Sequence, residues 1–100
     1  MVKRPTPAQT RLAAKRIGAQ LTAWRKLYGL TAAQVAERAD VSRSTLRRLE
    51  QGEAAMGLDS FLNVCRSLGV LDAVVKATDP YETDFGRARA DQMLPKRVRQ

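Results

Sequence analysis

Residues 30–52 read LTAAQVAERADVSRSTLRRLEQG, and the spacing within this stretch decides the fold. Thr31 is a preferred helix N-cap, and Gln34 stands three residues later, as in a capping box. Ser42 can cap a second helix in the same way. Apolar residues recur at helical spacing after each cap, which predicts two short helices joined by a turn at residues 40–41. The inward positions are Val35, Ala36, Ala39, Val41, Leu46 and Leu49.

Helical periodicity continues on both sides of this stretch. An apolar stripe with a spacing of three to four residues predicts a long helix over residues 8–28. Further stripes predict helices over residues 58–68 and 71–77, and a weaker one follows at 83–93. The residues expected to face the core are Ile17, Leu21, Trp24, Leu27 and Tyr28 in the long helix, and Leu58, Phe61, Leu62, Cys65 and Leu68 in the helix over 58–68.

No stretch has the alternating pattern of a strand, so the sequence predicts an all-α protein with five core helices. It divides into a flexible basic arm at residues 1–9, a domain at 10–77 and a polar C-terminal extension at 78–100. Two short helices can cross closely only where small side chains meet, which places Ala36 at the crossing. Asp40 is expected to adopt left-handed backbone in the turn, because Asp tolerates that conformation better than most residues.

The composition restricts the chemistry that the protein can perform. The 100 residues include one cysteine and no histidine. One cysteine allows no internal disulfide, and the absence of histidine removes the commonest general acid or base and the usual nitrogen ligand of zinc. There is also no glycine-rich phosphate loop and no nucleophile elbow. We therefore expect no enzymatic activity, no catalytic residue, no metal site and no cofactor.

The net charge of +8 indicates a polyanionic partner, such as DNA, RNA or an acidic membrane surface. No apolar run is long enough to span a bilayer, and the first residues lack the apolar core of a secretory signal. We therefore expect a cytoplasmic protein that does not enter membranes. Basic residues near the two ends either contact a partner or only keep these ends soluble: Lys3, Arg4, Lys96, Arg97 and Arg99.

The motif at residues 30–52 resembles the Cro/cI (xenobiotic-response-element) family of helix-turn-helix proteins, and the resemblance extends over about residues 14–76. It implies a lambda-repressor-like DNA-binding domain of five helices. One departure concerns Ala32, where many relatives carry a glutamine that hydrogen-bonds a phosphate. Alanine cannot make this contact, so another group must supply it. The shared residues are Leu30, Thr31, Gln34, Ala36, Val41, Ser42, Leu46, Leu49, Glu50 and Gly52.

The resemblance also implies which residues contact double-stranded DNA. The second helix of such a motif projects its N-terminal residues into the major groove. Arginine can donate two hydrogen bonds to guanine, so we expect guanine-containing half-sites read by Arg43 or Arg48, with Arg47 near the phosphate backbone. Outside such a motif, the same arginines would be only a solvated helix face. The full set of expected DNA-binding residues is Thr31, Gln34, Ser42, Arg43, Ser44, Thr45, Arg47 and Arg48.

A second apolar group lies late in the domain and is expected to mediate dimerisation. A single small domain that reads one half-site binds weakly, and members of the family dimerise near this end. Two copies would then place their recognition helices one DNA turn apart, roughly 34 Å. Alternatively, these side chains complete the core of the monomer. They are Val70, Leu71, Val74 and Val75.

The whole chain resembles the HipB-type antitoxins, and the segment at residues 79–99, DPYETDFGRARADQMLPKRVR, carries this narrower resemblance. It implies a homodimer that represses its own operon and binds a HipA-type kinase toxin through the extension. Two alternatives remain open. One is a stand-alone regulator of the Cro/cI type without a toxin. The other is an adaptor that uses the same fold to bind protein or RNA.

Overall fold

The computed structural model describes residues 4–93, in which every regular element is a helix and no strand occurs. The all-α prediction is therefore confirmed. The expectations for Lys3, Lys96, Arg97 and Arg99 lie outside the described residues. Within the described range, no helix is both long and apolar enough to cross a membrane. The elements are α1 (Ala8–Leu27), α2 (Ala32–Ala39), α3 (Arg43–Glu50), α4 (Leu58–Ser67), α5 (Leu71–Ala77), the 3-10 turn η1 (Pro80–Glu82) and α6 (Asp84–Met93).

The predicted caps of α2 and α3 both form. The Gln34 amide donates to Thr31 Oγ1 at 3.1 Å, and the Thr31 amide donates to Gln34 Oε1 at 2.8 Å. Ser42 Oγ accepts a hydrogen bond from the Thr45 amide at 2.9 Å. Asp40 ends α2 in the left-handed region, with φ 57° and ψ 44°. Local chemistry therefore sets both ends of the turn between α2 and α3, as the sequence predicted.

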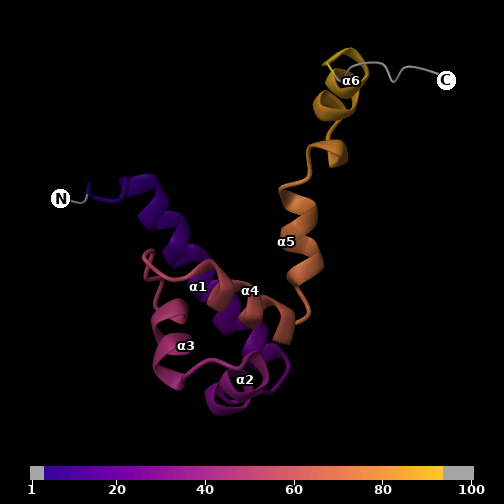
Figure 1. Cartoon of the computed structure of the whole chain (residues 1–100). Coiled ribbons are helices and arrows are strands. Elements are labelled where there is room, and N and C mark those ends of the chain that lie inside the picture. Colours follow the sequence, from indigo (N-terminus) through magenta and orange to yellow (C-terminus); the bar gives the residue numbers. More distant parts are fainter. Residues whose placement is uncertain (1–3, 94–100) are drawn as a thin grey trace.

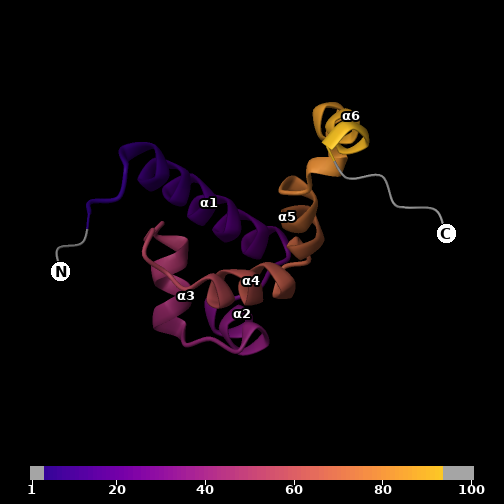
Figure 2. The same cartoon turned by 45° about the horizontal axis from the view of Figure 1, so that its top comes forward.

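Helices α1 to α4 pack around a small core. Figures 1 and 2 show the arrangement of these helices from two directions. Ala36 is 3% exposed, as expected for a residue at a close helix crossing. Cys65 is fully buried, and this burial raises the pKa of its thiol. The role predicted for Cys65, a small core residue, is confirmed. The buried core consists of Leu21, Val35, Ala36, Ala39, Leu46, Leu49, Val64, Cys65 and Leu68.

Several apolar residues predicted to be in the core are exposed instead. Trp24 is 41% exposed and stacks on Tyr28, with ring centroids 5.9 Å apart, along the outer part of α1. Leu58 is 68% exposed, whereas Val64, which the pattern did not single out, is fully buried. Ile17, Leu27 and Tyr28 are also exposed. The physical reason is that α1 packs mainly against α3, so only part of its wide apolar stripe meets another helix.

Two glycines allow α1 and the end of α3 to approach closely. Gly18 is buried, and a Cβ atom there would lie 2.5 Å from the Leu49 carbonyl oxygen and 2.7 Å from that of Glu50. Gly52 has φ +82°, and a Cβ atom on it would collide with the backbone of Lys15. The backbones of α1 and α3 are therefore nearly in contact, which explains why both positions lack a side chain.

The C-terminal part of the chain leaves this bundle. Helix α5 packs on α4, with Val70, Leu71 and Val74 half-buried against the core. Beyond α5, η1 and α6 extend away from the other helices (Figures 1 and 2). The radius of gyration is 17.8 Å, compared with about 13 Å for a compact domain of 100 residues. The extension predicted beyond residue 77 is therefore partly helical, and it projects from the bundle.

We predict that Gly18→Ala lowers the free energy of unfolding by at least about 2 kcal/mol. Alanine favours the helix, but its methyl group would overlap backbone carbonyl groups that cannot move without displacing α3. Chemical denaturation followed by circular dichroism measures the change. The matched control is Gly57→Ala, where the new methyl group would meet only the carboxylate of the exposed residue Asp59. Equal stability of the two variants would contradict the close approach of α1 and α3.

Candidate nucleic-acid interface

Helix α3 is held in place by an ion pair to α1. Arg25 Nε lies 2.8 Å from Glu50 Oε2, and Arg25 Nη2 lies 3.1 Å from Glu50 Oε1, so the guanidinium and carboxylate meet side by side. The third nitrogen, Nη1, donates to the Leu30 carbonyl at 3.2 Å. One side chain therefore connects α1, the segment before α2 and the end of α3.

This ion pair is largely shielded from water. The Arg25 and Glu50 side chains are 14% and 13% exposed. The hydrogen bonding that Arg25 donates to Glu50 raises the pKa of the Arg25 guanidinium, and it outweighs the partial burial that acts in the opposite direction. A planar guanidinium paired with a carboxylate through two bonds also fixes their relative orientation. The pair therefore determines the direction in which α3 presents its outer face.

On that face, side chains of α3 and the start of α2 line a hollow of about 310 Å³. Its lining consists of Ala32, Arg43, Ser44 and Arg47. In the first turn of α2, the Gln34 amide is capped by Thr31, whereas the amides of Ala32 and Ala33 have no intrahelical acceptor. Such amides commonly bind phosphate oxygens. The side chain of Ala32 is too small to cover them. Two arginines and a helix N-terminus therefore share one concave, electropositive surface.

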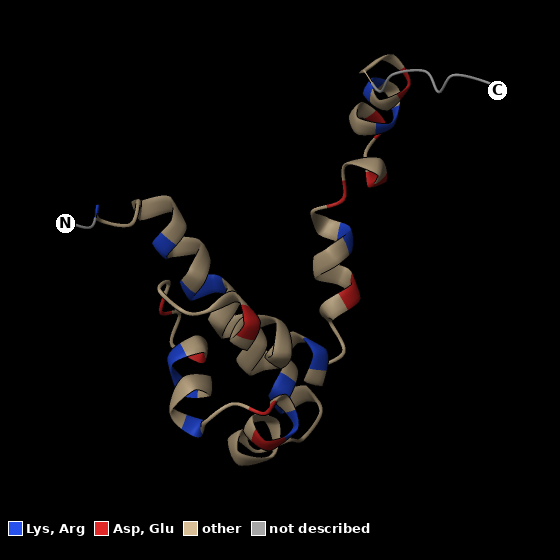
Figure 3. Ribbon diagram, in the orientation of Figure 1, with Lys and Arg blue, Asp and Glu red and all other residues tan. Residues whose placement is uncertain are grey.

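The charges of this surface are not neutralised by the rest of the domain. Arg43 and Arg47 are exposed, and within residues 4–93 neither forms an ion pair. Figure 3 shows basic residues on α3 and along α1, whereas acidic residues are frequent in the segment from α5 to α6. The outer face of α3 is therefore suited to a polyanion.

Arg48 differs from the other two arginines. Its Nη2 lies 2.7 Å from Glu53 Oε1, and its Nε donates to both carboxylate oxygens at 3.1 Å. This hydrogen bonding raises the pKa of Arg48 and lowers that of Glu53. The pair is exposed and turns Arg48 toward the loop after α3, away from the hollow. Arg48 therefore does not join Arg43 and Arg47, although it belongs to the same helix.

The remaining candidate residues take part in the caps. Gln34 uses its side-chain oxygen on the Thr31 amide, which leaves its NH₂ group to donate outward. Ser42 Oγ accepts from the Thr45 amide and donates to Thr45 Oγ1 at 2.9 Å, so both functions of its hydroxyl are used inside the protein. Thr45 is half-buried. Gln34 is therefore available to a ligand, whereas Ser42 mainly shapes the turn.

The sequence analysis did not assign roles to Arg25 and Glu53. Arg25 pairs with a residue 25 positions away, and periodicity within one helix carries no signal for such a contact. Glu53 follows Arg48 by five residues in a loop, outside the spacings at which side chains meet on a helix. Glu50 was noted only as a shared residue of the motif. The resemblance was therefore the one available signal for this ion pair.

Comparison with known proteins agrees with this geometry. The sequence model of a family described as a helix-turn-helix domain matches residues 16–78, which include α2, the turn and α3. The chain belongs to the helix-turn-helix domain family. This supports DNA as the polyanion, with α3 in the place of the recognition helix. The match ends before η1 and α6. No curated protein and no solved structure matches the chain.

The four residues predicted to mediate dimerisation are not equivalent. Val70, Leu71 and Val74 are half-buried and pack against the core of their own helix-turn-helix domain. Val75, by contrast, is 61% exposed on α5. Of the four, Val75 therefore offers the most surface to a second copy.

We predict that Arg25→Lys and Glu50→Gln each lower the free energy of unfolding by about 2 kcal/mol, because each leaves a largely buried charged or polar partner without its two-bond contact. The double variant should lose less than the sum of the two changes. Denaturant titration measures all three. Glu53→Gln, in the exposed pair with Arg48, is the control and should leave stability nearly unchanged. Additive losses from Arg25→Lys and Glu50→Gln would show that the two side chains act independently.

Proposed function

We propose that this helix-turn-helix protein is a sequence-specific transcriptional repressor that binds operator DNA as a homodimer. The observation that carries the proposal is the grouping of Arg43, Ser44 and Arg47 around the N-terminus of α2 on the exposed face of α3. A major-groove reader needs donors near the start of its recognition helix and phosphate contacts beside them. This surface offers both.

Each group on the surface has a distinct role in the proposed complex. Arg43, in the first turn of α3, donates two hydrogen bonds to O6 and N7 of a guanine. Arg47, one turn later, contacts the phosphate backbone. The amides of Ala32 and Ala33 and the NH₂ group of Gln34 bind a neighbouring phosphate, in place of the glutamine that many relatives carry at position 32. Arg48 contributes to base reading only if DNA displaces Glu53.

Repression in this proposal is steric, because a dimer on the operator excludes RNA polymerase. The protein's proposed target is the promoter of its own gene, as the resemblance to HipB-type antitoxins implies. We also propose that it is the antitoxin of a HipBA-type pair and that the dimer binds a HipA-type kinase toxin. The resemblance of residues 79–99 to HipB-type antitoxins supports this narrower role. A kinase gene beside its own and co-purification of the two proteins would test it.

The first test is fluorescence anisotropy with the DNA immediately upstream of the gene, compared with a scrambled duplex of the same composition at two salt concentrations. We expect tight binding to the upstream duplex, at least about 1,000-fold stronger than to the scrambled one. Affinity for both should fall with salt, because phosphate contacts release counterions. Equal, steeply salt-dependent binding to both duplexes, extended to a set of random sequences, would contradict a specific repressor and favour the adaptor alternative.

We predict that Arg43→Ala and Arg47→Ala weaken binding in different ways. Arg43→Ala should weaken binding to the operator by about 1–3 kcal/mol and leave binding to random DNA almost unchanged, because it removes base contacts. Arg47→Ala should weaken binding to both duplexes alike and reduce the salt dependence. The control is Arg66→Ala, since Arg66 lies in the last turn of α4 and donates to the Arg38 carbonyl. An equal loss on both duplexes for Arg43→Ala would refute its role as a base reader.

A further inference from the structure

The segment formed by η1 and α6, residues 80–93, is folded into two short helical elements, in which no residue is buried. Gly86 lies so close to the Pro80 carbonyl that a Cβ atom would collide with it, so α6 packs directly on η1. We call this unit the arm; it is distinct from the basic segment predicted at residues 1–9. A helix of 10 residues is marginal in water by itself. The arm therefore needs a surface to pack on, and its described contacts with α1 to α4 do not provide one.

The arm has an apolar side available for such packing. Tyr81, Phe85 and Met93 are 50%, 72% and 66% exposed, and they follow one another at multiples of four residues. Arg89, at the intervening position, lies over the Phe85 ring with its guanidinium carbon 5.6 Å from the centroid. Aromatic side chains this exposed are unusual on a surface that faces only water, and together they mark an interaction site.

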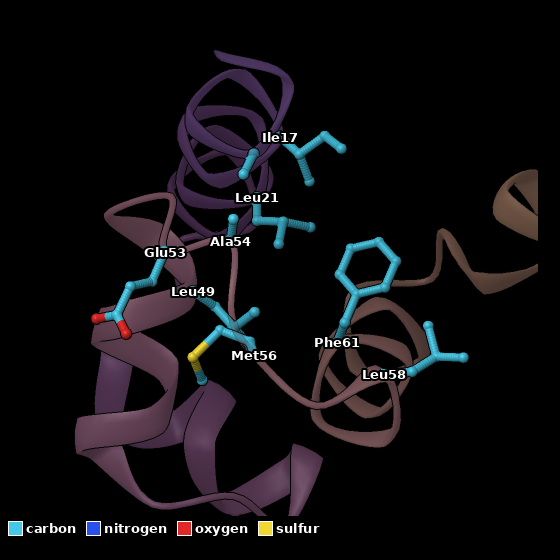
Figure 4. A pocket seen from close by; sticks show the side chains of 9 residues that line it. Ile17, Leu21, Leu49, Glu53, Ala54, Met56, Leu58 and Phe61 are labelled. Atoms are coloured by element: carbon cyan, nitrogen blue, oxygen red, sulfur yellow. The ribbon is translucent and has the colours of Figure 1, made fainter. Parts of the chain in front are cut away.

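A matching apolar groove lies between α1 and α4. It has a volume of about 240 Å³, and Ile17 and Leu58, which line it, are 41% and 68% exposed. Figure 4 shows Ile17 and Leu21 of α1 facing Phe61 of α4, while the carboxylate of Glu53 turns away from them. The lining is otherwise apolar: Ala14, Ile17, Leu21, Leu49, Ala54, Met56, Leu58 and Phe61. This groove is suited to an apolar helix face.

The arm of the same chain does not reach this groove. Val70, Leu71 and Val74 anchor the start of α5 to the core, and α5 then carries the arm away from α1 (Figures 1 and 2). One chain thus presents an unpaired arm and an unfilled groove. Two copies related by a two-fold axis can satisfy both, because each then gives its arm to the other.

The charge of the arm favours a second copy over DNA as its partner. Residues 80–93 contain three acidic and two basic side chains, a net charge of −1 in a chain of +8. Helix α1 has five basic residues and no acidic one, and Lys15 and Arg16 directly flank the groove residues Ala14 and Ile17. The arm and the groove therefore both offer apolar side chains, and their surroundings carry charges of opposite sign.

We propose that the arm of each copy docks into the α1–α4 groove of the other, giving an arm-exchanged homodimer. This inference rests on the homodimer of the proposed function and specifies the two surfaces that form it. The contact requires no DNA, so its test is separate from that of operator binding. Because the groove lies on α1 and α4, the outer face of α3 stays open to DNA.

The test measures the mass of the full chain in solution by sedimentation equilibrium, without DNA. We expect the wild type to be a dimer, and Phe85→Glu and Leu58→Glu each to raise the dimer dissociation constant at least about tenfold. A mixture of the two variants should recover dimer, because one intact arm can still meet one intact groove. Phe85 lies on an arm that buries nothing, so Phe85→Glu cannot unfold the bundle, and circular dichroism checks this for both variants.

The matched control is Leu27→Glu, which places the same charge on a residue that is 80% exposed and does not line the groove. It should remain a dimer. Val75→Glu tests the alternative contact through α5. A dimer that survives Phe85→Glu but dissociates with Val75→Glu would overturn arm exchange and leave the repressor proposal intact. A monomeric wild type would also overturn it, and retention of operator binding by that monomer would show that the proposed DNA contacts stand independently.

Discussion

The two-bond contact between Arg25 and Glu50 is the constraint on which the geometry of this domain depends. It joins α1 to the last residue of α3, and through the Leu30 carbonyl it also holds the segment that leads into α2. A core of nine buried residues contains no ionic group, so apolar packing alone gives little directional control over such short helices. A fork of hydrogen bonds from a guanidinium does control direction, since it weakens steeply when either partner rotates.

The close approach of α1 and α3 makes this contact possible. Gly18 and Gly52 have no side chain at the points where a Cβ atom would push the backbones of α1 and α3 apart. The ion pair then joins the last residue of α3 to α1. Because α3 is held against α1 on its inner side, its outer face is exposed to solvent, next to the start of α2. The exposure of Arg43 and Arg47 is thus a consequence of how the inner side of α3 is fixed. A preformed surface of this kind gains affinity for its ligand, because less entropy is lost on binding.

The C-terminal part of the chain, in contrast, keeps many of its apolar side chains exposed. The bundle is small, and α1 has a wider apolar stripe than the other helices of one chain can cover, so Ile17 and Trp24 remain exposed. The segment beyond α5 carries apolar side chains but no core of its own. Both features agree with the proposed association between chains. Half of the acidic residues of the chain lie in α5 and beyond it, away from the arginines on the outer face of α3.

The amino-acid sequence alone predicts the features that depend on neighbours along the chain: the caps at Thr31 and Ser42, the left-handed turn at Asp40, the approximate helix bounds and membership of a helix-turn-helix family. These follow from local hydrogen bonds and from periodicity, which a linear pattern records. Only the tertiary structure decided which residues meet across the fold. It paired Arg25 with Glu50, turned Arg48 toward Glu53 and away from Arg43, and left Trp24 and Leu58 exposed. Such contacts depend on the relative placement of whole helices, and the periodicity of a single helix shows an apolar face without showing whether another helix covers it.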